Sequence, residues 1–483
     1  MSIWVAAVAT AAAVAGPAQA GATSTSCGTD GAPSCQPRFS WMPGYEAPGT
    51  PANLDRVGVL KIGDPSASHI LVLNPGTSAA SAYFRPLADD VVRLTQGRWQ
   101  VWSVERRENQ LEDQSVLERF KEGRVTTTRL FNYYLGWLSD PSIKNHFKPI
   151  PDSSVSYARR WGMNTEIHDL HRVVEAARSG GRTVVLGGHS LGGTITTAYA
   201  TWDFGGTPGA SDLAGLVYID GGSDPVPVTR KEASQSLYKL KTSTPWLAFG
   251  GIPAPYLGIY SAAGSCGAVK QPNEPSVAYG SPILPANLKP SLPAGVVPTN
   301  EGEFGFATSV PSSPANLVAA QVHAGRLAGT GNPRGWIRGA AITPIQRYAA
   351  MLCGNGLDGI DGSAWYHPMR LTIDAGAVAD GNANPAQGVL NVQAIHGHDL
   401  SPRTLIYAFG AALGGESVLD DARTLAQQSG IPKGNLTLVN RARSYSHNDP
   451  SAASPTNAFV KNLIPFLSRV ANCHGHAGHR HGS

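Results

Sequence analysis

The chain has 483 residues, of which 42% are hydrophobic and 15% are charged. This composition is typical of a soluble globular protein, and the length suggests roughly two or three domains. The formal net charge of +4 is small for this length. It therefore gives no basis for nucleic acid or an anionic membrane as a partner.

The first 20 residues are typical of a secretory signal. Residues 3–15 form a short apolar run, and Ala18 and Ala20 supply the small residues that precede a cleavage site. Unlike a typical signal, the segment has no Lys or Arg before the apolar run. The run is also short for a membrane span. We expect cleavage after Ala20, export to the periplasm or the medium, and no integral membrane association afterwards. The alternative is an uncleaved N-terminal anchor.

Cysteine usage agrees with an oxidising compartment. None of the five cysteines forms a Cys-x-x-Cys pair, so zinc ribbons and thioredoxin-type motifs are not indicated. A disulfide between Cys266 and Cys353 could cross-link the middle region of the chain. A disulfide between any two of Cys27, Cys35 and Cys473 could fix one end of the chain. The spacing leaves the pairing open.

Strand and helix patterns alternate along most of the chain after an irregular Ser-, Thr-, Gly- and Pro-rich lead-in at 21–52. Strands are predicted at 57–62, 69–73, 99–104, 183–187, 215–219, 404–409 and 435–439. Helices are predicted at 83–94, 164–178, 194–202, 417–428 and 456–470. This alternation favours a mostly parallel sheet covered by helices on both faces. The charged run at 105–124 is interpreted as a solvated helix face.

The alternation stops between 223 and 399, where the chain is rich in Pro and Gly and carries scattered aromatic residues. We interpret this segment as a cap or lid inserted at the carboxyl ends of the strands, where ligands bind in open α/β sheets. The expected organisation is a signal at 1–20, a lead-in at 21–52, a first core part at 53–222, a cap at 223–399, a second core part at 400–472 and a flexible His-rich tail at 473–483.

A predicted strand, a sharp turn and a predicted helix meet at residues 183–202. The turn reads Gly-His-Ser-Leu-Gly over 188–192, the only Gly-x-Ser-x-Gly match in the chain. With 55 glycines the pentapeptide alone has little weight, but a strand before it and a helix after it make it a candidate nucleophile elbow. Ser190 is therefore the predicted nucleophile, at a helix N-terminus that favours a developing anion.

In this order the features resemble the α/β-hydrolase superfamily, in its secreted esterase and lipase branch. The resemblance covers roughly 55–222 and 400–470, and two motifs carry it: the turn at 188–193 and the segment 445–450 after the last predicted strand. It implies the α/β-hydrolase fold with a large inserted cap, and a Ser-His-acid triad. His447 lies in the second motif and is the expected base. His189 is expected to pack beside the serine and not to act as the base.

The acid departs from the usual pattern of the family. Relatives place it just after the penultimate strand, where this chain has no carboxylate before Glu416. Some lipases place it after the strand that follows the nucleophile helix, and Asp220 occupies that position. We predict Asp220 as the acid, with Glu416 as the alternative and Asp420 and Asp421 as further candidates.

The resemblance also implies an oxyanion hole made of two backbone N–H groups. One belongs to Leu191, the residue after the nucleophile, and the other comes from the loop after the strand at 69–73. Many relatives carry His-Gly in that loop. Aligning their glycine with Gly76 makes Thr77 the expected donor and Ser78 the second choice, because Pro75 has no N–H to donate.

The expected function is that of an exported serine hydrolase acting on a small-molecule or lipid carboxylic ester through an acyl-enzyme, with no cofactor and no metal. The histidines at 473–483 could bind a transition metal, but a flexible polar tail is the preferred interpretation. Acyl transfer, peptidase activity and perhydrolysis could use the same triad. A non-catalytic binding protein of this fold is the alternative from another class, favoured by the missing acid at its usual place.

Overall fold

The computed structural model describes residues 36–281 and 284–475. The predicted signal at 1–20, Cys27, Cys35 and most of the His-rich tail therefore lie outside the described residues. In the described part of the chain, no helix combines the length and apolar character that crossing a membrane requires.

The centre of the molecule is an eight-stranded sheet with the strand order β1-β2-β4-β3-β5-β6-β9-β10. Only β2 runs against the other strands, because it pairs antiparallel with both β1 and β4 while all other pairs are parallel. This order and direction of strands is the α/β-hydrolase fold. The strands are β1 (Arg38–Pro43), β2 (Arg56–Ile62), β3 (His69–Asn74), β4 (Trp99–Glu105), β5 (Thr183–His189), β6 (Gly215–Ile219), β9 (Leu405–Gly410) and β10 (Leu436–Asn440).

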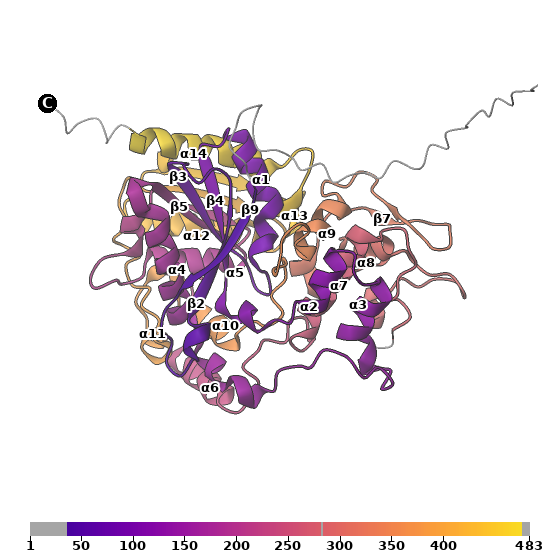
Figure 1. Cartoon of the computed structure of the whole chain (residues 1–483). Helices are drawn as coiled ribbons and strands as arrows, with labels where there is room; N and C mark the ends of the chain where they lie inside the picture. The colour runs from indigo at the N-terminus through magenta and orange to yellow at the C-terminus, as the bar shows by residue number, and fades with distance from the viewer. Residues whose placement is uncertain (1–35, 282–283, 476–483) are drawn as a thin grey trace, which may run out of the picture.

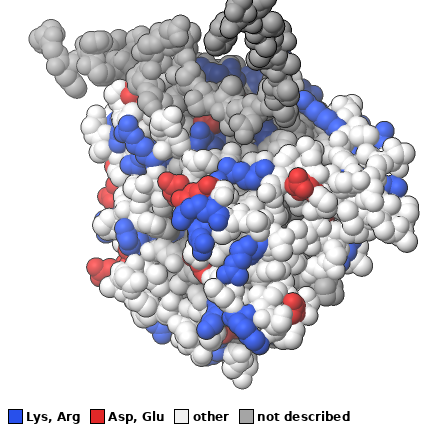
Figure 2. Space-filling view, turned by 45° about the vertical axis from the view of Figure 1, so that its right-hand side comes forward, with Lys and Arg blue, Asp and Glu red and all other residues white. Residues whose placement is uncertain are grey.

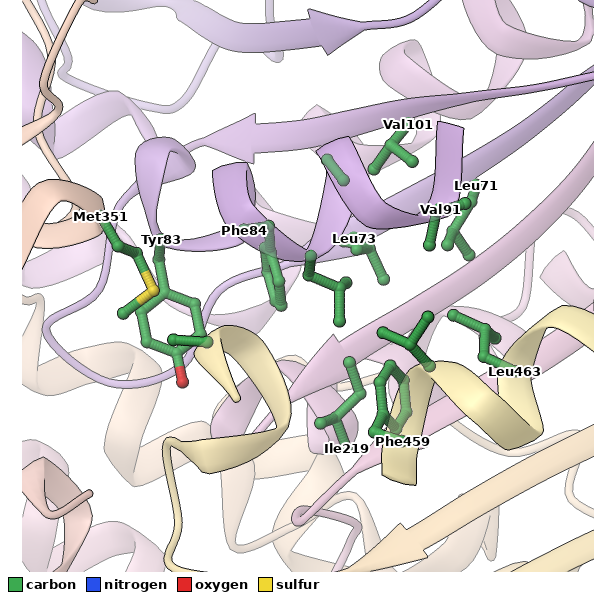
Figure 3. Close-up of a cluster of buried hydrophobic side chains, with 14 of the residues drawn as sticks. Leu71, Leu73, Tyr83, Phe84, Val91, Val101, Ile219, Met351, Phe459 and Leu463 are labelled. Carbon is green, nitrogen blue, oxygen red and sulfur yellow. The ribbon is translucent and has the colours of Figure 1, made fainter. Parts of the chain in front are cut away.

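Helices cover both faces of the sheet because successive strand residues point to opposite sides. Leu71 and Leu73 of β3 join the apolar cluster of α1 (Arg85–Leu94) and α14 (Ala458–Gly475). Figure 3 shows this face, with α1 and α14 packed against the strands. Ile70 and Val72 point the other way, into the cluster of α4 (Met163–Arg178) and α5 (Leu191–Ala200). Farther along that face, α12 (Gly415–Gln428) covers β6 and β9.

The prediction of an irregular lead-in is wrong for one segment of it. Residues 38–43 form the edge strand β1, whose residue Phe39 pairs with Leu60 of β2. The rings of Phe39 and Trp41 meet edge to face at 5.3 Å between centroids. Aromatic residues at alternate positions fit a half-buried strand. The Ser-, Gly- and Pro-rich sequence around this short segment concealed the pattern.

The prediction of a solvated helix face at 105–124 is wrong for its first part. A 3-10 turn, η3 (Arg107–Leu111), follows β4, and α2 (Ser115–Lys121) comes after it. Arg106 and Glu108 are buried as an ion pair at 2.8 Å, and Arg107 is buried against Asp169 at 2.6 Å. Buried charges are tolerated when they are paired and hydrogen-bonded. One of these partners is distant in the sequence, so charge pattern alone could not indicate burial.

The segment predicted as one cap, 223–399, divides into two parts. Its middle forms the cap with α7 (Tyr256–Lys270), α8 (Asn300–Thr308) and α9 (Ile345–Cys353). Its flanks, α6 (Arg230–Leu240), α10 (Met369–Ala375) and α11 (Pro385–Leu390), join the α4 and α5 side of the core.

The cap also includes α2 and α3 (Thr127–Tyr134), which precede the insertion in the chain. Apolar residues of these helices, such as Phe120 and Leu130, share a buried cluster with Ile259 of α7. In Figure 1 these helices lie together to one side of the sheet. A disulfide between Cys266 and Cys353 joins α7 to α9, which is the pairing considered for the middle of the chain.

Candidate active site

Ser190 stands in a strained turn between β5 and α5. Its backbone has φ 57° and ψ −125°, a region that residues with a side chain rarely adopt. The Ser190 N–H donates to the Ile219 carbonyl at 3.0 Å, and the Gly193 N–H donates to the Ser190 carbonyl at 2.8 Å. These bonds hold the turn between the end of β6 and the first turn of α5.

Glycines surround the turn because there is no room for side chains. A Cβ on Gly188 would lie 2.1 Å from the Gly192 carbonyl oxygen, and a Cβ on Gly192 would lie 2.1 Å from that of Asn74. A Cβ on Gly221 would lie 2.0 Å from the Ser190 carbonyl oxygen. Such close approaches of backbone to backbone require glycine. The backbone at 188–192 therefore has the conformation expected of a nucleophile elbow.

His447 and Asp220 form a buried pair at the carboxyl end of the sheet. The Nδ1 atom of His447 lies 2.7 Å from Oδ2 of Asp220, and both side chains are buried. Because a carboxylate only accepts, Nδ1 carries the proton of this hydrogen bond and Nε2 is left as an acceptor. His447 and Ser190 line the same cavity. This tautomer is the one that a general base for a serine needs.

Asp220 is held by the loop that follows β9. Its Oδ1 accepts hydrogen bonds from the N–H groups of Ala411 (2.6 Å), Gly414 (2.9 Å) and Gly415 (3.2 Å). Its Oδ2 accepts one from the N–H of Leu413 at 3.1 Å. This is the loop in which the family resemblance placed the acid. Here it carries no carboxylate and supplies backbone donors to the carboxylate of the neighbouring strand.

Hydrogen bonding keeps Asp220 ionised although it is buried. Burial by itself raises the pKa of this carboxyl, but the hydrogen bond from His447, the positive charge of that ring when it is protonated, and the N–H of Ala411 outweigh it. The net pKa is lowered from its ordinary value. A permanent negative charge therefore faces His447 at neutral pH.

The alternative acids lie elsewhere. Glu416 is on the surface, where it accepts hydrogen bonds from Arg423 at 2.8 Å and Asn440 at 2.5 Å. Asp420 pairs with the same arginine at 2.5 Å. Asp421 lies beside Gly222, and burial raises its pKa to about 7. In the described structure the carboxylate against His447 is that of Asp220.

The two predicted oxyanion donors lie on either side of the elbow. Leu191 is the first residue of α5, so its N–H has no acceptor within the helix. Thr77 and Ser78 lie in the loop after β3 and line the same cavity as Ser190. That loop approaches closely, since a Cβ on Gly76 would lie 2.8 Å from Cβ of Ser190. Their role in catalysis stays a prediction.

His189 forms a hydrogen bond with the loop that carries His447. Its Nε2 lies 2.9 Å from the carbonyl oxygen of His447, so Nε2 carries the proton of that bond. Burial lowers the pKa of His189 to about 3, and the neighbouring His447 adds to the effect. The ring is therefore neutral and packs against that of His447 at 4.2 Å between centroids.

Two residues that the sequence analysis did not single out tie the His447 loop to the cap. Asn448 accepts a hydrogen bond from the Tyr83 hydroxyl at 2.7 Å and donates to the Ala319 carbonyl at 2.9 Å. Asp449 accepts from the backbone N–H of His323 at 2.9 Å and from the Thr343 hydroxyl at 2.6 Å. Both follow His447 directly within the motif at 445–450, which was the available signal.

A cavity of about 250 Å³ opens in front of Ser190. Its walls come from the elbow, the loop after β3 and the cap, and they are mainly apolar. The larger apolar side chains are Tyr83, Phe249, Leu257, Tyr260, Leu288, Phe304, Leu317, Tyr348, Leu352 and Leu413. A second apolar cavity, of about 210 Å³, shares Leu257, Tyr260 and Leu288 with the first.

On the face shown in Figure 2, the distribution of charge does not indicate a charged partner. On the face shown in Figure 2, most of the described surface is uncharged, and acidic and basic side chains stand among each other. We see there no extended area of one sign that would attract a charged macromolecule.

Comparisons with known proteins found similar chains among solved structures alone. No family model matches the sequence, and no curated protein matches it. Among solved structures, a candidate lipase from Sulfolobus solfataricus is 13% identical with a TM-score of 0.46, covering 90% of this chain and 94% of that chain. A soluble variant of monoglyceride lipase from Saccharomyces cerevisiae is 9% identical with a TM-score of 0.35, covering 91% and 95%. A siderophore hydrolase from Aspergillus fumigatus is 14% identical with a TM-score of 0.30, covering 86% and 94%.

Proposed function

We propose that this chain, which has the α/β-hydrolase fold, is a serine hydrolase that cleaves carboxylic esters through an acyl-enzyme. One observation carries the proposal: His447, which is paired with the buried Asp220 at 2.7 Å, lines the same cavity as Ser190 in its strained turn. A non-catalytic protein has no need for a strained serine, a histidine of defined tautomer and an ionised carboxylate at one site.

The chemistry follows from the roles of these groups. Nε2 of His447 takes the proton of the Ser190 hydroxyl as Oγ attacks the ester carbonyl carbon. The carbonyl π electrons move to oxygen, which becomes an oxyanion facing the N–H groups of Leu191 and Thr77. The ionised Asp220 stabilises the imidazolium formed on His447. The oxyanion then collapses, the carbon–oxygen bond to the alcohol breaks, and the imidazolium protonates the leaving alcohol.

Release of the acyl group repeats these steps with water. His447 takes a proton from water as the water oxygen attacks the acyl carbon, and the tetrahedral adduct expels Ser190, which regains its proton. The acid product leaves and the site returns to its starting state. No cofactor is needed in this scheme.

The cavity supports an ester with an apolar part. Pockets for small molecules are typically apolar with a few polar groups that orient the ligand, and this cavity has both. Thr77, Ser78 and Ser190 are polar groups of the elbow and the loop after β3. The cap contributes mainly apolar side chains, together with the hydroxyls of Ser261, Thr308 and Ser363. We propose that the apolar acyl or alcohol group occupies the cap side.

We also propose that the protein is exported. The Cys266–Cys353 disulfide supports an oxidising compartment, in which such bonds form and persist.

The first test is labelling of the purified protein with a fluorophosphonate, followed by peptide mapping. We expect stoichiometric modification of Ser190, no label in Ser190→Ala, and a rate reduced by at least about 1000-fold in His447→Ala, because the unactivated hydroxyl is a weak nucleophile. Hydrolysis of p-nitrophenyl esters from acetate to decanoate then measures the acyl preference. Folded protein that neither reacts nor hydrolyses any of these esters contradicts the proposal and favours a binding protein.

A further inference from the structure

Arg106 stands behind the loop that carries Thr77, and the mechanism above gives it no role. Its side chain is 1% exposed. Nη1 donates to the Pro75 carbonyl at 3.0 Å, and Nη2 donates to the carbonyls of Gly76 and Ala79, each at 3.0 Å. Three carbonyl groups of one short loop therefore converge on one guanidinium.

The geometry of the peptide unit connects these bonds to the oxyanion hole. A trans peptide is planar, and its C=O and N–H point in opposite directions. The carbonyl of Gly76 and the N–H of Thr77 belong to the same peptide unit. When Arg106 holds the Gly76 carbonyl on its own side, the Thr77 N–H points away from Arg106. The elbow lies close to this peptide, since a Cβ on Gly76 would lie 2.8 Å from Cβ of Ser190.

We infer that Arg106 is a positioning residue for the oxyanion hole, and this inference rests on the proposed function. Arg106 orients the Gly76–Thr77 peptide so that the Thr77 N–H faces the oxygen of the reacting carbonyl. The positive charge at the carbonyl end of this peptide also polarises it, which strengthens the N–H as a donor in a buried setting.

The ion pair with Glu108 keeps Arg106 charged and in place. Nε of Arg106 donates to Oε1 of Glu108 at 2.8 Å, and Glu108 is also buried. Burial by itself lowers the pKa of Arg106, but the charge and hydrogen bond of Glu108, together with the charges of neighbouring carboxyls, outweigh it and the net pKa is raised. Nε is thus used by the carboxylate, and the two terminal nitrogens are left for the loop.

Backbone hydrogen bonds to the inserted segment 223–399 hold the rest of the loop after β3. The Ala80 N–H donates to the Gly362 carbonyl at 3.1 Å, and the Ala364 N–H donates to the Ser78 carbonyl at 3.0 Å. Those bonds fix the residues after Thr77. The Gly76 carbonyl also accepts from the Ala79 N–H at 3.3 Å, a longer bond within the loop. Arg106 bonds the carbonyls of Pro75 and Gly76, whose peptide units flank Gly76, at 3.0 Å each, and it is the side chain that restrains the direction of the predicted donor.

The chain offers a matched control in the next residue. Arg107 is likewise buried, and it donates to Asp169 at 2.6 Å, to Asp55 at 2.7 Å and to the Tyr45 carbonyl at 2.8 Å. It thereby ties the N-terminal segment to α4, and none of its described hydrogen bonds reaches the loop at 74–80. Replacing either arginine disturbs a buried ionic network of similar size.

The experiment compares Arg106→Lys with Arg107→Lys, since lysine keeps the charge but lacks the planar fork that reaches several carbonyls at once. With a p-nitrophenyl ester, we expect Arg106→Lys to lower kcat by roughly 10- to 100-fold with KM changed less than about threefold, because a misdirected donor weakens mainly transition-state binding. Affinity for a trifluoromethyl ketone, which forms a tetrahedral adduct with a serine, should fall by a similar factor. We expect Arg107→Lys to lose comparable thermal stability with kcat within about twofold of wild type.

Hydrogen exchange separates this inference from the proposed function. We expect faster deuterium uptake at 74–84 in Arg106→Lys and around 44–56 in Arg107→Lys, whether or not the protein hydrolyses esters. A wild type without activity contradicts the proposed function, and the exchange data still test the restraint. Unchanged exchange at 74–84, or an equal loss of kcat in both variants, overturns the role of Arg106. If Arg106→Lys does not fold, the double variant Arg106→Gln with Glu108→Gln removes both buried charges and is judged by the same criteria.

Discussion

Asp220 acquires its position against His447 from two neighbouring strands. The residue follows β6, and the loop that donates to its carboxylate follows β9, which pairs directly with β6. The carboxyl ends of parallel neighbours lie at the same edge of the sheet. An acid on either strand can therefore reach the same histidine, and here the second strand contributes backbone N–H groups in place of the side chain.

Replacement of this carboxylate has a defined consequence. In Asp220→Asn we expect kcat for ester hydrolysis to fall by roughly 1000- to 10,000-fold, because the amide favours the wrong tautomer of His447 and removes the charge that stabilises the imidazolium. Circular dichroism checks that the variant is folded. Glu416→Gln, a surface carboxylate close in sequence to the loop after β9, should remain within about twofold of wild type. A large loss in Glu416→Gln with an active Asp220→Asn would reverse the assignment.

At the level of elements, the cap is a composite of segments from two parts of the chain. Helices α2 and α3 come before the elbow, whereas α7, α8 and α9 come after β6. One apolar cluster joins α2 and α3 to α7 and α9, and another joins α8 to α7 and α9. The Cys266–Cys353 disulfide joins α7 and α9 across a sequence separation of 87 residues. A long loop closed in this way restricts the unfolded chain strongly.

Removing the disulfide should therefore destabilise the cap. For the double variant Cys266→Ser with Cys353→Ser, we expect the free energy of unfolding to fall by about 3–5 kcal/mol. Urea denaturation followed by tryptophan fluorescence measures the change, and limited proteolysis should show earlier cleavage within 223–399. A reducing agent should shift wild type toward the variant and leave the variant unchanged. Equal stability of variant and wild type would show that the bond does not restrain the folded cap.

At the scale of the whole molecule, buried carboxyls lie at the junction of sheet and cap. Burial raises the pKa of Glu105 to about 7 and that of Asp361 to about 6, and it also raises the pKa of Glu112. Glu105 ends β4, and Asp361 lies in the insertion. Gln114 donates to both Glu112 and Asp361 at 2.8 Å. Ionisation of these groups weakens the junction, so stability depends on pH.

The sign of this dependence can be tested at Glu105. Because the folded-state pKa is above the unfolded one, folding favours the protonated form, and stability falls as pH rises from about 4.5 to about 7. The amide introduced by Glu105→Gln does not titrate, so we expect the variant to match wild type near pH 5 and to exceed it by about 1–3 kcal/mol near pH 8. The Asn109 amide, whose oxygen has no described partner, can turn to accept from the new amide. Urea denaturation at both pH values measures the effect, and a variant less stable at pH 8 than at pH 5 relative to wild type contradicts it.

Local patterns in the sequence were enough for most of the fold. Apolar strand segments that alternate with helical segments, and a glycine-flanked serine, are patterns of residues that are near in the chain. The structure places the central strands and the elbow where these patterns predicted them. The edge strand at 38–43 was missed because its pattern is short. The charged run at 105–124 was misread because the carboxylate that buries Arg107 lies 62 residues away.

The candidate site likewise combines features that local sequence predicts with features that only the tertiary structure determines. The sequence by itself determined the strained turn at Ser190 and placed His447 in the loop after the last strand, because a turn and a strand end are local features. Only the tertiary structure decided which carboxylate lies against His447, across 227 residues, and which cation holds the loop of Thr77, across 30 residues. Hydrogen bonds of this kind depend on which strand ends meet at the edge of the sheet, and that arrangement exists only in the folded chain.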